Sequence, residues 1–171
     1  KTNLPSKNVK FKDEFSEQFS HKFVHTCILN KREPKLVIKY GNQKDKYHNK
    51  PKLILAHKMY GFPYLDYSGI YGISNRDNYV ITHRTTQHLR RLKDFLSTYF
   101  ALFIYESTRY RMKYLEKYAF ELMPDISEID NFPEVITDDS VANFFGLSAS
   151  EKEYIVKFYN GRCYSFEPII S

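Results

Sequence analysis

The feature that most constrains the fold is a change of hydrophobic period close to residue 84. From Lys52 to Ile81 the sequence reads KLILAHKMYGFPYLDYSGIYGISNRDNYVI, and its short apolar runs alternate with Gly- and Pro-rich turns. This pattern is typical of β-strands joined by tight turns. From Thr85 to Glu106 the apolar residues recur every three or four positions, which predicts an amphipathic helix. This apolar stripe consists of Leu89, Leu92, Leu96, Tyr99 and Phe103.

Shorter patterns predict the remaining elements. Residues 21–29 and 35–40 are rich in β-branched and aromatic side chains and are expected to be strands. Residues 41–51 contain Gly, Asn, Asp and Pro without an apolar period, so they are predicted to form a loop with a basic tip. Near the C-terminus, Ser148 and Glu151 have the spacing of a capping box at the start of a helix.

These elements together predict an α+β fold. A mostly antiparallel sheet from 21–83 is expected to pack on one long amphipathic helix at 86–106. Two short helices are predicted within 137–160 as a small helical C-terminal part. We expect residues 1–126 to form the sheet and long helix, with residues 127–171 as a small acidic helical extension packed on them.

Positive charge is concentrated in the first two thirds of the chain. Residues 1–113 contain 22 Lys and Arg against 9 Asp and Glu, a net charge of +13. Residues 114–171 contain 4 against 11, a net charge of −7, and the two parts sum to the overall +6. A basic body of this kind is typical of proteins that bind polyanions such as nucleic acids. A lysine-rich solvated surface is the alternative interpretation of the same excess.

Composition excludes other classes of protein. No run approaches the roughly 18 apolar residues of a membrane-spanning helix, and the polar N-terminus has no signal-peptide pattern, so an intracellular protein is expected. Cys27 and Cys163 give no disulfide framework and are expected to be idle thiols. The chain has 15 Tyr and 14 Phe but no Trp, which predicts an aromatic core. Because it begins with Lys, we expect it to be part of a longer polypeptide.

Signatures of catalysis are missing from the sequence. It has no P-loop, no dinucleotide-binding glycine motif, no nucleophile elbow and no zinc-protease motif. His21, His25 and Cys27 would share one face of a strand, but no second ligand cluster follows at a suitable spacing. We therefore predict no catalytic residues, no metal site and no cofactor-binding residues in this chain.

A small nuclease is the remaining enzymatic hypothesis. Glu33, Pro34 and Lys35 have the E-x-K form of some metal-dependent nucleases, and Asp13 is a candidate for the distant acid. Such triplets arise often by chance, and a proline fits a metal-binding strand poorly. Recognition is therefore favoured over catalysis.

Aromatic and basic side chains around the 52–81 hairpin are the candidates for contact with nucleic acid. Aromatic rings stack on exposed bases, arginine suits guanine edges, and asparagine suits adenine edges. The aromatic candidates are Tyr60, Phe62, Tyr64, Tyr67, Tyr71 and Tyr79. At least half of these are expected to fill the core instead, Tyr71 and Tyr79 foremost. The predicted DNA-binding set is Lys58, Tyr60, Arg76, Asn78, Arg84, Arg90, Arg109, Arg111 and Lys113.

The order of elements resembles a known family. After the hairpin come LKDFLSTYFALFIY at 92–105, YRMKYLEKYAFELMPDI at 110–126 and FGLSASEKEYI at 145–155. These segments resemble the C-terminal target-recognition region of adenine-specific DNA methyltransferases and fused type II restriction–modification enzymes of the TaqI-like kind. The resemblance covers roughly residues 52–155 and rests on loose apolar patterns. Two positions depart from the family's pattern. Ser97-Thr98 replaces its Asn-Ser, and Pro124-Asp125-Ile126 stands where it has a proline, an apolar residue and a second proline.

The resemblance implies a function for this chain as part of a larger enzyme. In that family the Asn-Pro-Pro-Tyr-type motif and the S-adenosylmethionine site lie in a separate N-terminal catalytic domain, and neither appears here. The expectation is sequence recognition on double-stranded DNA, while a partner domain flips out and methylates an adenine. The alternative is a protein–protein interaction or structural module, for example of a viral protein, with the acidic 114–171 segment in the interface.

Overall fold

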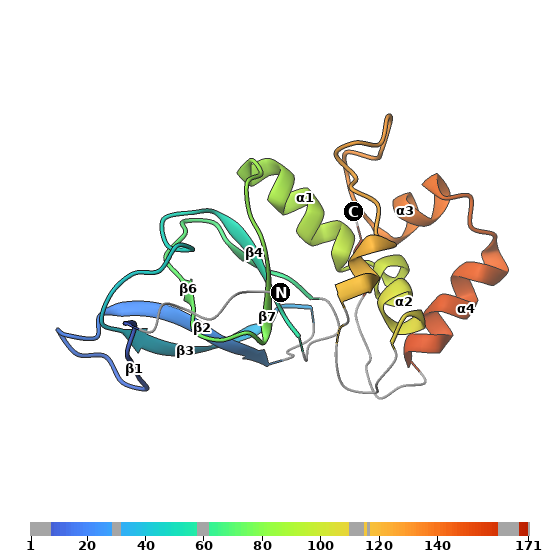
Figure 1. Cartoon of the computed structure of the whole chain (residues 1–171). Helices are drawn as coiled ribbons and strands as arrows, with labels where there is room; N and C mark the ends of the chain where they lie inside the picture. The colour runs from blue at the N-terminus through green and yellow to red at the C-terminus, as the bar shows by residue number, and fades with distance from the viewer. Residues whose placement is uncertain are drawn as a thin grey trace.

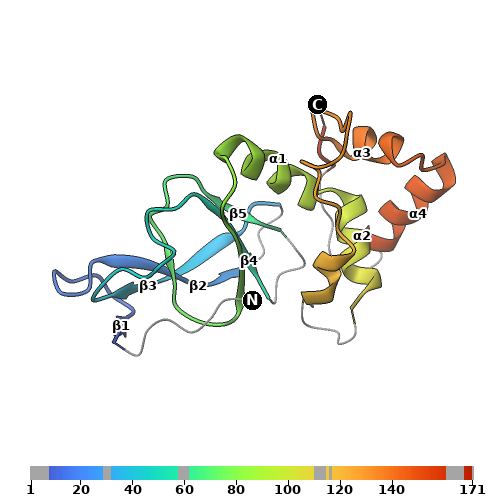
Figure 2. The same cartoon turned by 45° about the horizontal axis from the view of Figure 1, so that its top comes forward.

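The computed structural model separates strands from helices along the chain. Figure 1 shows the strands gathered on one side, α2 to α4 on the other, and α1 between them, and the turned view in Figure 2 agrees. No helix within the described part of the chain is long and apolar enough to cross a membrane. The described residues are 8–28, 32–57, 62–109, 115, 117–160 and 168–170.

The first sheet has the strand order β1-β3-β2-β6. β1 (Phe11–Lys12) and β2 (His21–Ile28) both pair antiparallel with β3 (Lys35–Gly41), whereas β6 (Gly72–Ile73) pairs parallel with β2. A bulge interrupts the β2–β3 register after Val24. The strands predicted near 21–29 and 35–40 are thus confirmed.

The second sheet has the strand order β5-β4-β7 and is antiparallel throughout. It consists of β4 (Lys52–Ala56), β5 (Tyr64–Asp66) and β7 (Asn78–Ile81). Every residue of β4 is buried, because the strand contacts both α1 and β2. The single sheet expected across 21–83 is therefore two small sheets. After β3 the chain does not pair again with the first sheet directly but forms β4, the central strand of the second.

The long helix predicted at 86–106 is broken. α1 (Thr86–Leu96) and α2 (Tyr99–Ser107) are separate helices, each with its own N-cap threonine. The Thr98 side chain accepts a hydrogen bond from Ala101 N, and Asp138 Oδ1 accepts one from Tyr99 N at 2.6 Å. Threonine competes with the helical backbone and favours caps, so the prediction of one continuous helix was wrong at this position.

The C-terminal part is helical, as predicted. A short 3₁₀-helix, η1 (Lys117–Glu121), is followed by α3 (Asp138–Phe144) and α4 (Ala149–Asn160). The predicted capping box is confirmed, since Ser148 N donates to Glu151 Oε2 at 2.8 Å and Glu151 N donates to Ser148 Oγ at 3.3 Å.

One buried hydrophobic cluster joins the strands to the helices, and much of it is aromatic. Phe95 and Phe132 meet edge to face at 5.7 Å between ring centroids, and Phe100 stacks on Phe145 at 4.5 Å. Tyr159 also donates a hydrogen bond to Leu102 O at 2.6 Å. The Trp-free composition is thus compensated by phenylalanine and tyrosine, which bury large areas.

Arg32 also fastens the first sheet to the helical part. Its guanidinium donates to Ser97 O at the α1–α2 break, lies 3.4 Å from Asp138 Oδ2, and covers the Tyr99 ring at 4.9 Å from the centroid. Because Asp138 also caps α2, one arginine and one carboxylate fix the break relative to the β2–β3 connection.

Candidate nucleic-acid interface

The predicted DNA-binding set does not form one continuous surface among its described members. Asn78 opens β7 opposite Ala56, and Ile81 ends it opposite Leu53. Arg76 therefore lies beyond one end of this sheet, whereas Arg84 and Arg90 follow its other end. Four of the predicted residues lie outside the described part of the chain, namely Lys58, Tyr60, Arg111 and Lys113.

Asn78 has a structural role in place of the predicted contact with an adenine edge. Its side chain is fully buried, and its amide donates to His25 O at 3.2 Å and to Asn75 Oδ1 at 2.9 Å. The amide thereby ties the β6–β7 turn to β2. Sequence reasoning misplaced it because the hydrogen-bond partner lies 53 residues away.

Two of the predicted arginines are engaged in ion pairs. Arg109 lies 2.6 Å from Glu106, and both side chains are largely buried, so this pair serves the end of α2. Arg84 lies 2.9 Å from Asp125 in a more exposed pair, which solvent screens strongly. Among the described members of the set, Arg76 and Arg90 are exposed and have no ion-pair partner, and they lie on different parts of the surface.

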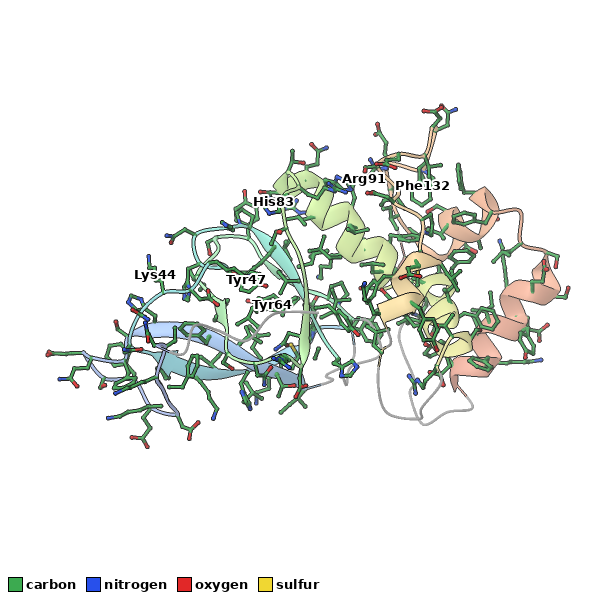
Figure 3. The ribbon with its side chains drawn as sticks, in the orientation of Figure 1. Lys44, Tyr47, Tyr64, His83, Arg91 and Phe132 are labelled. Carbon is green, nitrogen blue, oxygen red and sulfur yellow. The ribbon has the colours of Figure 1, made fainter. Side chains whose placement is uncertain are left out.

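The structure brings other basic residues together at the start of β2. The 42–51 loop, which leaves β3, meets the 67–71 turn between β5 and β6 and encloses a pocket of about 290 Å³. We call this the loop-end pocket; Lys44 on its rim is labelled in Figure 3. Its lining residues are Ser20, His21, Lys22, Lys44, His48, Asn49, Ser68, Gly69 and Ile70.

Two glycines allow the loop-end pocket to form. Gly69 has φ +69°, and a Cβ there would lie 2.3 Å from Lys50 N, so only glycine permits the turn to approach the loop so closely. Asn49 N donates to Gly69 O at 2.7 Å across this contact. A Cβ on Gly72 would lie 2.3 Å from His48 Cε1, so this glycine makes room for the imidazole.

A buried ion pair holds the loop from beneath. Lys52 Nζ lies 2.5 Å from Asp66 Oδ2, and both side chains are inaccessible to solvent. The same ammonium donates to Tyr47 O at 2.9 Å and Lys50 O at 3.2 Å, which fixes the loop backbone. Asp66 in turn accepts from the backbone N–H groups of the 67–71 turn. One ion pair therefore positions both walls of the pocket.

A second pair lies at the floor of the pocket. Asp45 Oδ1 is 2.9 Å from His48 Nδ1, while His48 Nε2 is 3.1 Å from Lys22 O. Burial raises the pKa of Asp45, but hydrogen bonds from His48, Ile73 and Tyr47 outweigh this effect and hold the pKa below its ordinary value. Asp45 is thus an ionised carboxylate whose charge is already used inside the loop.

Two lysines of the pocket lining and two more in the 42–51 loop are exposed cations. Lys22, Lys44, Lys46 and Lys50 are all exposed, and none has a carboxylate partner among the described residues. Burial, with smaller contributions from His48 and Lys44 nearby, lowers the pKa of His21. Their positions lie in or beside the loop for which the sequence predicted a basic tip.

Aromatic residues of the hairpin divide between core and surface. Tyr79 is buried and donates to Leu115 O at 2.9 Å, and Tyr71 packs against Tyr64 at 6.0 Å between ring centroids. Both therefore belong to the core, as predicted. Tyr67, beside the loop-end pocket, is 60% exposed and is available to stack on a ligand.

The metal and nuclease hypotheses gain no support from the arrangement. No group of three His, Cys, Asp or Glu side chains suited to a metal ion occurs within the described ranges. Asp13 pairs with Lys39 at 3.3 Å and Glu33 with Lys93 at 2.9 Å, so each acid has a separate cation. Burial raises the pKa of Cys27 to about 12, which makes its thiol unreactive.

Comparison with protein-family models, curated proteins and solved structures finds no match to this chain.

Proposed function

We propose that this chain binds double-stranded DNA as the target-recognition part of an adenine N6-methyltransferase or restriction–modification enzyme. The observation that carries the proposal is a group of four exposed lysines, two lining the loop-end pocket and two elsewhere in the 42–51 loop, that have no carboxylate partner among the described residues. The resemblance of residues 52–155 to such target-recognition regions gives the partner and the role. Catalysis and S-adenosylmethionine binding belong, in this proposal, to a separate domain of the parent enzyme.

Unpaired lysines favour a polyanion for an energetic reason. A lysine already paired with a carboxylate must give up that partner to bind a phosphate, whereas an unpaired lysine exchanges only water and counterions. Phosphate contacts hold a protein in register on the duplex but carry no sequence information by themselves. The loop end is therefore proposed to position the DNA.

Sequence discrimination requires contacts to base edges elsewhere on the surface. Arg76 and Arg90 are the described members of the predicted set whose guanidinium groups face solvent, and arginine is the commonest reader of guanine. Tyr67 offers an exposed ring for stacking on an unpaired base. These three residues are the proposed contacts beyond the backbone.

The test is a salt titration of DNA binding. A fluorescent duplex is titrated with the wild-type chain and with the triple variant Lys22→Gln/Lys44→Gln/Lys50→Gln at several salt concentrations. We expect the slope of log K against log salt to fall by about 0.9 for each phosphate contact removed. The matched control, which removes the same charge elsewhere, is Lys35→Gln/Lys117→Gln/Lys157→Gln.

Two results count against the proposal. Binding that is absent, or that does not depend on salt, contradicts a phosphate-contacting function. Equal losses in the two triple variants would show that only net charge matters. Arg84→Ala and Arg111→Ala provide a further arm, since both residues belong to the predicted set and their loss is expected to weaken binding with a smaller salt slope.

An interaction module is the second candidate, and a different surface favours it. An apolar cleft of about 320 Å³ lies between β7, α1 and η1, with Leu92, Phe120 and Met123 among its lining residues. Leu122 and Val135 are also more than half exposed. If duplex DNA fails to bind, sedimentation of the chain with its parent catalytic domain tests this alternative.

A further inference from the structure

The loop-end pocket presents hydrogen-bond donors from three separate segments. Ser20, His21 and Lys22 come from the start of β2, Lys44 and Asn49 from the 42–51 loop, and Ser68 from the 67–71 turn. None of the described residues that line the pocket carries a carboxylate. An anion there would meet donors on several sides and no like charge.

The two carboxylates nearest in the structure are fully used by the protein. Asp45 accepts hydrogen bonds from Tyr47 N at 2.9 Å and Ile73 N at 3.0 Å, besides its contact with His48. Asp66 accepts from Lys52 Nζ and from the backbone N–H groups of Ile70 and Tyr71. Each carboxylate therefore has a basic side chain and two N–H partners of its own, and neither is paired with a lysine of the pocket lining.

His48 is fixed beside the pocket by contacts at both ring nitrogens. Its Nε2 lies 3.1 Å from Lys22 O. Its Nδ1 lies 2.9 Å from Asp45 Oδ1 and 3.0 Å from Asp45 N, whose N–H donates to it. These contacts hold the imidazole in the pocket lining, while Asp45 itself stays outside that lining.

From this arrangement we infer that the loop-end pocket is a binding site for one phosphate group, held by His21, Lys22 and Lys44. The phosphate group could belong to the DNA backbone, in which case the inference rests on the proposed function. It could equally belong to free phosphate or to a phosphorylated small molecule, which present the same group to the pocket. Lys44, whose Nζ lies 3.1 Å from Asn49 Oδ1, and Lys22 both line the pocket, from the 42–51 loop and from β2.

Phosphate fits this site better than a carboxylate does. It offers acceptor oxygens in a tetrahedral arrangement, which matches donors that come from three segments, whereas a carboxylate is planar. The pocket volume of about 290 Å³ is close to the lower limit of about 300 Å³ for small-molecule sites. It therefore has room for the group bonded to the phosphate, such as a sugar.

The test uses the whole, isotope-labelled chain and inorganic phosphate as the probe. Phosphate is titrated at constant ionic strength while the imidazole signals of His21 and His48 are followed by NMR, with His21→Gln for assignment. We expect a saturable shift of the His21 signal and a rise in its pKa, because the bound anion stabilises the imidazolium. Acetate at the same concentrations is expected to bind at least about fivefold more weakly.

Single variants locate the binding site. Lys22→Gln and Lys44→Gln are each expected to raise the phosphate Kd about tenfold, the effect of one charge-assisted hydrogen bond. Both lysines are exposed, so their loss should leave the fold intact, which the same NMR spectra check. Lys35→Gln removes one exposed charge from the far end of β3 and is expected to change the Kd less than twofold.

Duplex DNA in the same titration separates this inference from the proposed function. If phosphate saturates and DNA does not bind, the pocket stands with free phosphate as its ligand, and the DNA-binding proposal fails. If DNA binds without moving the His21 signal, the pocket inference is overturned and the proposed function survives. Non-saturating phosphate shifts, equal effects of Lys35→Gln and Lys44→Gln, or equal affinity for acetate also overturn the inference.

Discussion

The region around the loop-end pocket and the helical part of this chain differ in whether their cations have carboxylate partners. Around the α1–α2 break and the end of α2, Arg32 pairs with Asp138 and Arg109 with Glu106. At the loop end, the exposed lysines have no carboxylate partner among the described residues. The difference teaches that a basic sequence supplies two kinds of cation, those that the fold holds in ion pairs and those that it leaves exposed to a partner.

The loop end is ordered without using its surface charges. Its backbone is fixed by the buried Lys52–Asp66 pair and by the Asp45–His48 pair beneath it. Because internal pairs position the walls, the rim lysines remain available to a ligand. This separation of anchoring charges from surface charges can be tested by removing them one at a time.

The largest effect is expected from the anchor of the loop end. Lys52→Met leaves Asp66 as an uncompensated buried carboxylate and removes two bonds to the loop backbone. We expect a loss of about 3–5 kcal/mol in the free energy of unfolding, measured by urea denaturation. The control is Lys50→Met, an exposed neighbour, which should change stability by less than about 0.5 kcal/mol. A loss below about 1 kcal/mol for Lys52→Met would contradict the anchoring role.

The second effect concerns the pair that fixes the helical part. Asp138→Ala removes the acceptor for Tyr99 N and Ile169 N and also removes the ion pair with Arg32. We expect the free energy of unfolding to fall by about 2 kcal/mol, as for the loss of a good helix cap with one further hydrogen bond. Asp139→Ala, next to it on α3 and mostly exposed, is the matched control and should be nearly neutral. Equal effects of the two variants would show that Asp138 does not stabilise the start of α2.

The third prediction exchanges the roles of a paired and an unpaired cation. Lys44→Gln is expected to lower the salt slope of DNA binding by about 0.9 and to leave stability unchanged. Arg109→Gln is expected to lower stability, because it removes the largely buried ion pair with Glu106, and to leave the salt slope unchanged. Salt-dependent binding assays and urea denaturation of both proteins provide the four measurements. A large change of the salt slope in Arg109→Gln would show that this paired arginine also contacts DNA, and would contradict the difference between the two regions.

The smallest effect is a pH dependence of the Asp45–His48 pair. The folded-state pKa of Asp45 lies below its ordinary value of 3.8, so the carboxylate stabilises the fold above that pH. This contribution is lost as the pH falls from 3.8 through the lower folded-state pKa. The stability difference between wild type and Asp45→Asn should therefore be constant near neutral pH and shrink below 3.8, as measured by urea unfolding. Asp13→Asn makes the same substitution at an exposed carboxylate and is the control variant for the unfolding series.

Local patterns were sufficient for the elements whose signals are themselves local. Strands near 21–29 and 35–40, the helices within 137–160 and the Ser148–Glu151 capping box were all predicted correctly. Each depends on side-chain period or on contacts between residues a few positions apart. The break at Ser97 also has a local signal, because Ser-Thr is a favourable cap, but the apolar stripe across it outweighed that signal in the prediction.

The candidate site was predictable only in its charge. The sequence marked the 41–51 loop as basic, yet it gave no sign that Lys52 would be buried while Lys50 would stay exposed. Burial of Lys52 depends on Asp66, which lies 14 residues away and reaches it only when β4 and β5 pair. The interpretation of Asn78 failed for the same reason, since its partner is on β2.

The amino-acid sequence by itself determined an α+β chain with an aromatic core, a basic first two thirds and an acidic remainder. Composition is sufficient for the charge and for the aromatic content of the core, and short-range periodicity is sufficient for the helices and strands. Neither property requires knowing which distant residues come into contact. The tertiary structure alone decided which charges are neutralised and which remain free. An ion pair requires two side chains within a few ångströms, and the partners in some of these pairs, such as Arg32 and Asp138, lie far apart in sequence.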